Sequence, residues 1–216
     1  MIGLKMGKMN RIELIEDYLN YLYPDPKCEL NYSKDYELLI AVVLSAQATD
    51  KSVNKVSCIL FDKYPSLRAL KEAKIEDIID IIKPIGTYNR KAVYIKEIAT
   101  ILLDKYNGVV PLSRKELETL PGVGRKVSNV ILSEWFKEPS IAVDTHVNRV
   151  SKRLGLAKET DSVLDVEKKL QKSFKKDDWS KRHLQLVLFG RYKCKSIKPL
   201  CDDCKLKDIC KKNKKG

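Results

Sequence analysis

Lys126 is a residue whose setting could support chemistry, because it follows a glycine-rich turn. The segment "LPGVGRK" (120–126) interrupts a helical pattern with Pro121, Gly122 and Gly124, and it puts Lys126 in the first turn of the next predicted helix. A lysine nucleophile must be a neutral amine, and at a reference pKa of about 10.4 only about one amine in a few thousand is neutral at pH 7. The helix dipole lowers this pKa by less than about one unit, so partial burial must supply the rest. The alternative is a lysine that binds phosphate or lies on the surface.

The turn before Lys126 could itself bind a phosphate. Gly122 and Gly124 permit backbone angles and close approaches that side chains would block, and Pro121 ends the preceding helix. The next helix then begins with free N–H groups that point into the turn, where oriented donors and the helix dipole attract an anion. The other interpretation is an ordinary structural turn between two helices.

A second chemical group, the carboxylate of Asp144, lies in "VDTHVNRV" (143–150). Asp144 precedes an apolar stripe at Val147, Val150 and Leu154, so it is predicted to cap the helix that begins there. A carboxylate beside a sugar could also stabilise the positive charge that remains when a base is lost, or assist proton transfer. The two roles are compatible, because a cap fixes the carboxylate in place.

Four cysteines close to the C-terminus have the spacing of a metal centre. They are Cys194, Cys201, Cys204 and Cys210, in the pattern C-x6-C-x2-C-x5-C. Tetrathiolate sites hold zinc or an iron–sulfur cluster. A zinc ribbon usually has two C-x2-C pairs and this segment has one, which favours iron–sulfur and leaves zinc as the alternative. The other cysteines, Cys28 and Cys58, are predicted to be core residues.

The composition favours a polyanionic partner. The chain of 216 residues carries a formal net charge of +13, and Lys193–Gly216 contains nine lysines. Such an excess is typical of proteins that bind nucleic acid, and a metal-tied basic loop suits phosphate contacts. No apolar run approaches the roughly 20 residues of a membrane span, and the start has no signal-peptide core. We therefore expect a cytoplasmic protein, whose translation could begin at Met1, Met6 or Met9.

The periodicity of the chain predicts an all-α fold with a small cysteine-bound appendix. Helices are expected over Arg11–Tyr23 and Lys91–Tyr106, and the apolar run Leu38–Leu44 is interpreted as a buried helix because few segments alternate as partner strands would. Further helical patterns follow in "SRKELETL", "RKVSNVILSEWF", "DTHVNRVSKRLGL", "SVLDVEKKLQKSF" and "WSKRHLQLVLFGRY".

Taken together, these segments resemble the helix–hairpin–helix DNA glycosylases, and most closely the endonuclease III family. The resemblance rests on "LLIAVVLSAQATDKSVNK", "IGTYNRKA", "LPGVGRK", "IAVDTHVNRV", "FGRYKC" and the cysteine pattern, in this order over nearly the whole chain. It implies two helical domains with a DNA cleft between them. Residues 28–138 would form a six-helix barrel that includes the helix–hairpin–helix (about 113–136), and residues 1–27 with 139–216 would form a domain that carries a [4Fe–4S] cluster on the four cysteines.

The resemblance also implies an activity, which is excision of oxidised pyrimidines from duplex DNA followed by nicking at the abasic site. The amine of Lys126 would attack the sugar C1′, and Asp144 would assist. The residues implied to contact DNA are Gln47, which fills the gap left by a flipped base, Thr87, Gly122, Val123, Gly124, Arg125 and His146. A lysine at position 126 separates such glycosylase/lyases from relatives that only remove a base. The alternative is a non-catalytic helix–hairpin–helix DNA-binding module.

Thr87 departs from the family pattern, because relatives often carry leucine there as an apolar wedge beside the lesion. Threonine is smaller and more polar, so strand opening or the preference for the opposite base is expected to differ. In "FGRY", relatives often have histidine before the glycine, a change expected to be minor. We expect the protein to act as a monomer on damaged double-stranded DNA in a prokaryotic nucleoid.

Overall fold

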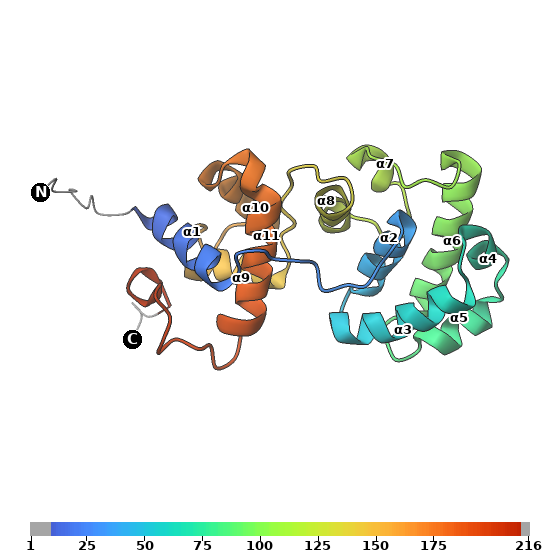
Figure 1. Ribbon diagram of the computed structural model, residues 1–216, viewed down its shortest axis with the longest axis horizontal. Coiled ribbons are helices and arrows are strands. Elements are labelled where there is room, and N and C mark those ends of the chain that lie inside the picture. Colours follow the sequence, from blue (N-terminus) through green and yellow to red (C-terminus); the bar gives the residue numbers. More distant parts are fainter. Residues whose placement is uncertain (1–9, 213–216) are drawn as a thin grey trace, which may run out of the picture. The chain divides into compact units, whose positions relative to one another are not determined.

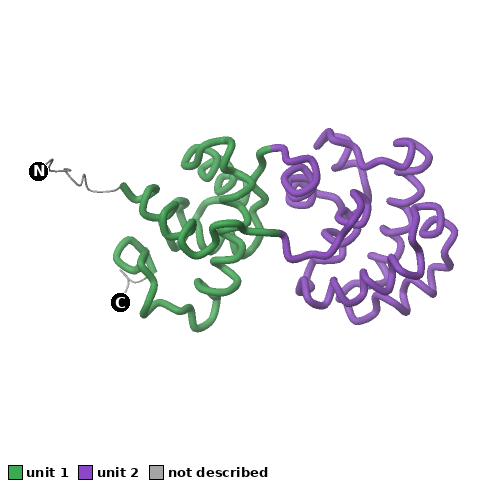
Figure 2. Tube along the Cα trace, in the orientation of Figure 1, with its two compact units in different colours: residues 1–27, 139–216 green, residues 28–138 purple. Residues whose placement is uncertain are grey.

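The computed structural model describes residues 10–212, and Figure 1 follows them along the chain from blue to red. Every regular element in this part of the chain is a helix or a helical turn, which confirms the all-α prediction. None of these helices is both long enough and apolar enough to cross a membrane. The chain divides into two compact units, drawn in separate colours in Figure 2: unit 1 is Met1–Lys27 with Pro139–Gly216, and unit 2 is Cys28–Glu138.

Unit 2 consists of consecutive helices that pack on one another. They are α2 (Asp35–Leu44), α3 (Asp50–Lys63), α4 (Leu67–Glu72), α5 (Ile75–Ile82), α6 (Tyr88–Tyr106), α7 (Arg114–Leu117) and α8 (Arg125–Glu134). Both α4 and α5 pack against the long helix α6, and α7 packs against α8. Asn107 ends α6 in the left-handed conformation, and Gly108, which also has a positive φ, follows it.

The helix α2 is the buried centre of unit 2. All of its residues from Tyr36 to Leu44 are buried, and it packs against α3, α6 and α8. A helix that is apolar all round is typical of a core position. The interpretation of Leu38–Leu44 as a buried helix is therefore confirmed.

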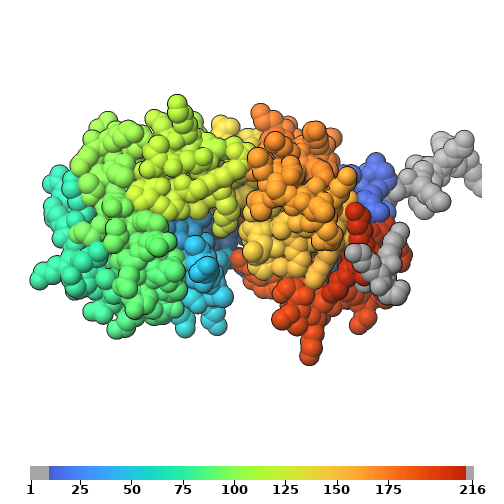
Figure 3. Space-filling view, turned by 180° about the vertical axis from the view of Figure 1, so that it is seen from behind, coloured from blue at the N-terminus to red at the C-terminus, as the bar shows by residue number. Residues whose placement is uncertain are grey.

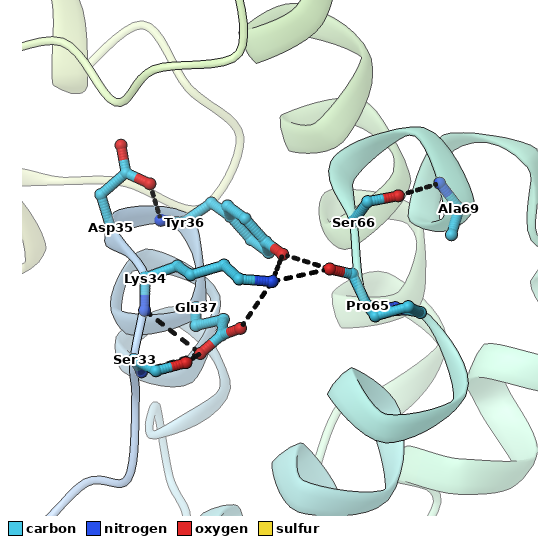
Figure 4. Close-up of polar contacts among 8 residues, drawn as sticks. All are labelled: Ser33, Lys34, Asp35, Tyr36, Glu37, Pro65, Ser66 and Ala69. Carbon is cyan, nitrogen blue, oxygen red and sulfur yellow. Dashed lines mark hydrogen bonds and ion pairs between the residues drawn. The ribbon is translucent and has the colours of Figure 1, made fainter.

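Polar contacts fix the start of α2, as Figure 4 shows. The Glu37 carboxylate accepts hydrogen bonds from the N–H and the hydroxyl of Ser33, both at 2.8 Å, and from the N–H of Lys34 at 3.2 Å. The Lys34 ammonium lies 3.1 Å from the Tyr36 hydroxyl and donates to the Pro65 carbonyl at 2.7 Å. These bonds cap α2 and join it to the turn that precedes α4.

Unit 1 brings the N-terminal helix together with the C-terminal half of the chain. Its elements are α1 (Arg11–Leu22), α9 (Thr145–Arg153), α10 (Val163–Ser173), α11 (Trp179–Leu188) and the short turns η1 (Lys176–Asp178), η2 (Phe189–Lys193, π-helical) and η3 (Lys207–Ile209). The helix α11 packs against α1, α9 and η2. Its buried Arg182 pairs with Glu16 of α1 at 3.1 Å and donates to Asn20 at 2.9 Å, so a polar network ties α1 to the unit.

The two isolated cysteines are not core residues, and that prediction is wrong. Cys58 is exposed on α3, and Cys28 is half-buried at the start of unit 2. The amphipathic pattern of α3 explains the first case, because Val53, Val56 and Leu60 form its buried face and Cys58 lies outside that stripe.

Candidate functional site

The start of α8, where Lys126 lies, is fixed by contacts inside the hairpin. The Arg114 guanidinium of α7 donates to Oδ1 of Asn129 at 2.6 Å, and Asn129 is fully buried in α8. The Ser128 hydroxyl donates to the Gly124 carbonyl at 3.2 Å. The yellow-green segment that contains α7 and the turn lies on the visible surface in Figure 3. The hairpin thus has a rigid interior and an accessible outer side.

The two glycines of the turn have different roles. Gly122 has a φ of +74°, and a Cβ added there would lie 2.7 Å from Cδ2 of Tyr94 and 3.2 Å from Cγ1 of Val43. Gly124 has a φ of −103°, and a Cβ added there would meet nothing within 4 Å. The special backbone angle expected of these glycines is therefore found at Gly122 only, where the protein itself also fills the space of a side chain. No contact inside the protein requires a glycine at position 124, because a side chain there would extend into open space.

The start of α8 has no side-chain cap. Gly124 is the N-cap residue and supplies no side-chain cap, so the first-turn N–H groups have no acceptor within the helix. The N–H of Val123 is different, because it donates to the Leu120 carbonyl at 3.1 Å, and Val123 is buried. Of the turn predicted to bind a phosphate, only the side at Gly124 is thus available to a ligand.

Lys126 occupies the predicted place in the first turn of α8, and its side chain is exposed. The partial burial expected for a lysine nucleophile is therefore not provided by the protein alone. Arg125 beside it is exposed as well. Two adjacent cations at an open helix N-terminus can attract a polyanion, and a bound polyanion could then exclude water from the amine.

Gln47 and Thr87 are exposed and share an uncommon backbone conformation. Gln47 has a φ of +57° and Thr87 a φ of +59°, in the left-handed region that glycine favours. Gln47 follows α2, and Thr87 is the N-cap residue of α6 without a side-chain cap. The hydroxyl of Thr87 donates instead to the carbonyl of Gly86 at 2.6 Å. Strained positions of this kind cluster at functional sites.

Asp144 caps α9 in unit 1, as predicted. Its carboxylate accepts the N–H of Val147 at 2.7 Å, and its side chain is half-buried. The buried residues Val147 and Val150 place α9 in the core of unit 1. The cap therefore holds the carboxylate in one orientation and leaves its second oxygen able to accept from another group.

The segment "FGRY" holds the start of α9 in place, and sequence reasoning underestimated it. A Cβ added at Gly190 would lie 2.8 Å from Cβ and 3.2 Å from Cα of His146. Arg149 of α9 donates to the Gly190 carbonyl at 2.7 Å and lies 3.2 Å from Nδ1 of His146. Phe189 is a fully buried core residue that packs edge-on against Tyr18. The glycine and the phenylalanine are thus structural requirements of unit 1.

The four C-terminal cysteines line a single cavity. It comprises about 320 Å³ of space including its open mouth, and its other lining residues are Leu154, Phe189, Lys193, Pro199, Leu200 and Lys207. None of the four cysteines forms a disulfide, and burial raises the pKa of the Cys204 thiol. Within residues 10–212, no three His, Cys, Asp or Glu side chains lie close enough together to hold a single metal ion.

Basic residues hold the cysteine segment against unit 1. Arg153 of α9 contacts the sulfur of Cys194 at 3.3 Å and donates to the Lys195 carbonyl at 2.7 Å. Arg11 of α1 donates to the Ile209 carbonyl at 2.7 Å. The red segment that carries the cysteines lies on the visible surface in Figure 3. These partners are far apart in sequence, so the cysteine spacing could not reveal them.

Sequence reasoning also missed Lys91, the one lysine among the buried polar residues of the described chain. Its ammonium donates to the carbonyls of Leu44 and Ala46, directly before Gln47. Burial lowers the pKa of Lys91. A lysine in the motif "IGTYNRKA" gives no sequence signal of burial.

The chain is similar to known DNA repair proteins over nearly its whole length. Residues 40–176 match the model of the HhH-GPD superfamily base excision DNA repair proteins. Endonuclease III of Bacillus subtilis (strain 168) is 45% identical over 215 residues, covering 98% of each chain. Endonuclease III of Escherichia coli (strain K12) is 44% identical over 210 residues, covering 97% of this chain and 99% of the relative.

Solved structures show the same similarity. A trapped endonuclease III–DNA covalent intermediate has a TM-score of 0.91 and 47% identity, covering 96% of this chain and 98% of that one. A thermostable thymine-DNA glycosylase has a TM-score of 0.82 at 23% identity, which supports the fold alone. The matching regions include the hairpin with Lys126 and the helix that Asp144 caps. The chain therefore belongs to the HhH-GPD superfamily of base excision DNA repair proteins and, within it, to the endonuclease III family.

Proposed function

We propose that this protein is a bifunctional DNA glycosylase and abasic-site lyase that removes oxidised pyrimidines from duplex DNA. The observation that carries the proposal is the 47% identity to an endonuclease III captured as a covalent DNA intermediate, combined with a lysine exposed at the open N-terminus of α8. A covalent intermediate requires a nucleophile, and an exposed amine beside a phosphate-binding turn can supply one.

The reaction begins when the neutral amine of Lys126 attacks C1′ of the damaged nucleotide. The bond between C1′ and the base breaks, and the base leaves with the electron pair and takes up a proton. Asp144 stabilises the positive charge that develops on the sugar. The C1′–O4′ bond then breaks as O4′ takes up a proton from solvent and the Lys126 nitrogen forms a protonated Schiff base with C1′. A C2′ proton is removed, and the C3′–O bond breaks with the 3′ phosphate as leaving group.

The open side of the turn binds the DNA backbone in this proposal. A phosphate beside Gly124 would accept the first-turn N–H groups of α8 and meet the cation of Arg125. Gly122 supports the turn from inside, and the buried side chain of Val123 anchors it. His146, at the start of α9, would contact DNA from unit 1, while Gln47 and Thr87 would contact the lesion site from unit 2.

We further propose that unit 1 holds a [4Fe–4S] cluster and that residues 28–138 form the barrel domain. Four cysteines that line one cavity support a tetrathiolate centre, and the single C-x2-C pair in their spacing favours an iron–sulfur cluster over a zinc ribbon. The ligands would be the thiolates of Cys194, Cys201, Cys204 and Cys210. When bound, the cluster would supply a covalent crosslink of the 194–212 segment. Iron with acid-labile sulfide in the purified protein supports the assignment, and a colourless protein that contains zinc contradicts it.

Borohydride trapping tests the lyase mechanism. Incubation with a duplex that carries one oxidised pyrimidine, in the presence of borohydride, should give a covalent protein–DNA complex. The variant Lys126→Ala should lose the complex completely, because no amine remains to be reduced. Lys115→Ala, which removes an exposed lysine from the neighbouring helix α7, should trap as well as wild type.

Two outcomes contradict the mechanism. One is a wild-type protein that gives no trapped complex, and the other is a Lys126→Ala variant that traps normally. A purified protein that binds duplex DNA but does not nick it at an abasic site would favour the non-catalytic DNA-binding module instead.

A further inference from the structure

The buried residue Lys91 contacts the two loops that contain Gln47 and Thr87, the exposed residues with left-handed backbone angles. The Lys91 ammonium donates to the Leu44 carbonyl at 3.0 Å and to the Ala46 carbonyl at 2.7 Å, and Lys91 is only 3% exposed. Burial lowers the pKa of this amine, with no neighbouring charge among the causes. Its partners are carbonyls at the C-terminal end of α2, where the negative end of the helix dipole favours a cation. A buried cation is costly unless it is well satisfied, so this contact is a specific feature of the fold.

The same residue contacts the second loop through its backbone. The N–H of Lys91 donates to the carbonyl of Thr87 at 3.1 Å. The two loops lie close to each other, since a Cβ added at Gly86 would come within 3.9 Å of the Gln47 carbonyl oxygen. One residue therefore holds the chain directly before Gln47 with its side chain and the carbonyl of Thr87 with its backbone.

Both exposed residues held in this way are strained. The φ angles are +57° at Gln47 and +59° at Thr87, and neither residue is a glycine. Such conformations persist only where the surroundings over-determine them. The side-chain bonds of Lys91 provide this constraint, because they join the first turn of α6 to the carbonyl of Leu44, the last residue of α2, and to that of Ala46 just beyond it.

We propose that Lys91 is a positioning residue for lesion recognition, which holds the loops of Gln47 and Thr87 in one fixed arrangement. The inference rests on the proposed function, in which these two side chains contact the DNA where a base is extruded. Lys91 does not reach the DNA itself, since it is buried. Its effect should therefore appear in the step that unpairs a base and not in the chemistry at Lys126.

Single-turnover kinetics with saturating enzyme on two duplexes test the proposal. One duplex carries thymine glycol, a paired lesion that must be extruded, and the other carries a preformed abasic site, which has no base to unpair. Lys91→Met, which keeps the apolar stem and removes the donors, should slow release of the base from the paired lesion by about 10- to 100-fold. Its cleavage of the abasic duplex should stay within about threefold of wild type, because Lys126 and Asp144 are unchanged.

Lys96 offers a matched control on the same helix. Its ammonium donates to the carbonyls of Lys71 and Ala73 at the end of α4, away from both loops. Lys96→Met thus removes the same type of bond to a helix C-terminus. It should lower the melting temperature and leave the ratio of the two rates at the wild-type value. If Lys91→Met does not fold, Lys91→Gln, which retains a shorter donor, takes its place in the same comparison.

The outcomes separate this inference from the proposed function. Wild-type rates on both duplexes in the Lys91 variant would refute the inference, and so would an equal loss on both, which indicates a purely structural role. A selective loss in the Lys96 variant would refute it too. A wild-type protein that cleaves neither duplex would refute the proposed function, and this inference with it.

Discussion

At the scale of single residues, the two glycines of the hairpin should respond differently to the same substitution. Gly122→Ala forces a side chain into a left-handed backbone position and against the Tyr94 ring, so it should cost about 1–2 kcal/mol or more of unfolding free energy. Gly124→Ala meets no atom of the protein. Alanine is a poorer N-cap residue than glycine, which destabilises the variant, but it also lowers the entropy of the unfolded chain, which stabilises it. The two effects roughly cancel, so the unfolding free energy should change by less than about 0.5 kcal/mol.

DNA affinity should fall in the Gly124→Ala variant although its stability changes little, because the new methyl group would occupy the space proposed for a phosphate. Denaturant unfolding and duplex binding of both variants check the pair of expectations. A stable Gly122→Ala variant would contradict the strain argument. An unchanged DNA affinity in the Gly124→Ala variant would show that no phosphate binds at this side of the turn.

Asp144 combines two roles that a pair of substitutions can separate. Asparagine caps helices about as well as aspartate, so Asp144→Asn should keep the stability of the protein and lose the anion, with a large loss of excision rate. Asp144→Ala should lose the rate and also about 1 kcal/mol of stability, because the N–H of Val147 loses its acceptor. Thermal melts and single-turnover rates measure the two effects. If the Asp144→Asn variant excised the base at the wild-type rate, the only role of Asp144 would be to cap α9.

The sequence predicted residue roles where local spacing determines them. Asp144 stands before an apolar stripe, and the cap follows from that pattern. Burial depends on the whole fold, so the expected burial of Lys126 and the core position of Cys58 could not be judged from neighbours in the chain. The demand for glycine at Gly122 comes from Tyr94 and Val43, which are distant in sequence.

At the scale of elements, the packing of α9 against η2 depends on Gly190. A methyl group there would overlap the backbone and Cβ of His146, neither of which can rotate away. Gly190→Ala should therefore cost about 1–3 kcal/mol through overpacking. For a chain of this size the melting temperature should fall by roughly 2–4 °C for each kcal/mol. A variant that melts like wild type would show that α9 and η2 can separate without cost.

Helix types were easier to predict from the sequence than the contacts between helices. The run Leu38–Leu44 is apolar on every side, and this alone indicates a core helix. The bond from Lys91 of α6 to the last carbonyls of α2 joins segments more than 40 residues apart. Lysine is seldom buried, so composition argues against that contact and only the fold reveals it.

At the scale of the whole molecule, the proposed reaction needs residues from both units. Lys126 lies in unit 2 and Asp144 in unit 1, and the chain passes between the units at residues 27–28 and 138–139. Each unit has its own buried core. The two proposed reacting groups are thus held by different compact units of the chain.

The strong positive charge of the molecule should make DNA binding depend steeply on salt. Each phosphate that a lysine or arginine neutralises adds about 0.9 to the slope of log affinity against log salt concentration. Lys195 and Lys198 are exposed on the cysteine segment, and the backbone of this segment is held by Arg153. If this segment binds DNA, replacing both lysines with glutamine should reduce the slope by about one for each phosphate that is no longer neutralised.

The effect of position can be separated from the effect of net charge. Lys168 and Lys172 are exposed on α10 of the same unit, so Lys168→Gln with Lys172→Gln removes the same two charges elsewhere. Binding of specific phosphates predicts a smaller slope only in the Lys195 and Lys198 variant. A diffuse attraction by the net charge of +13 predicts equal, small changes in both. Equal slopes in the two variants would therefore show that the cysteine segment does not bind the DNA backbone.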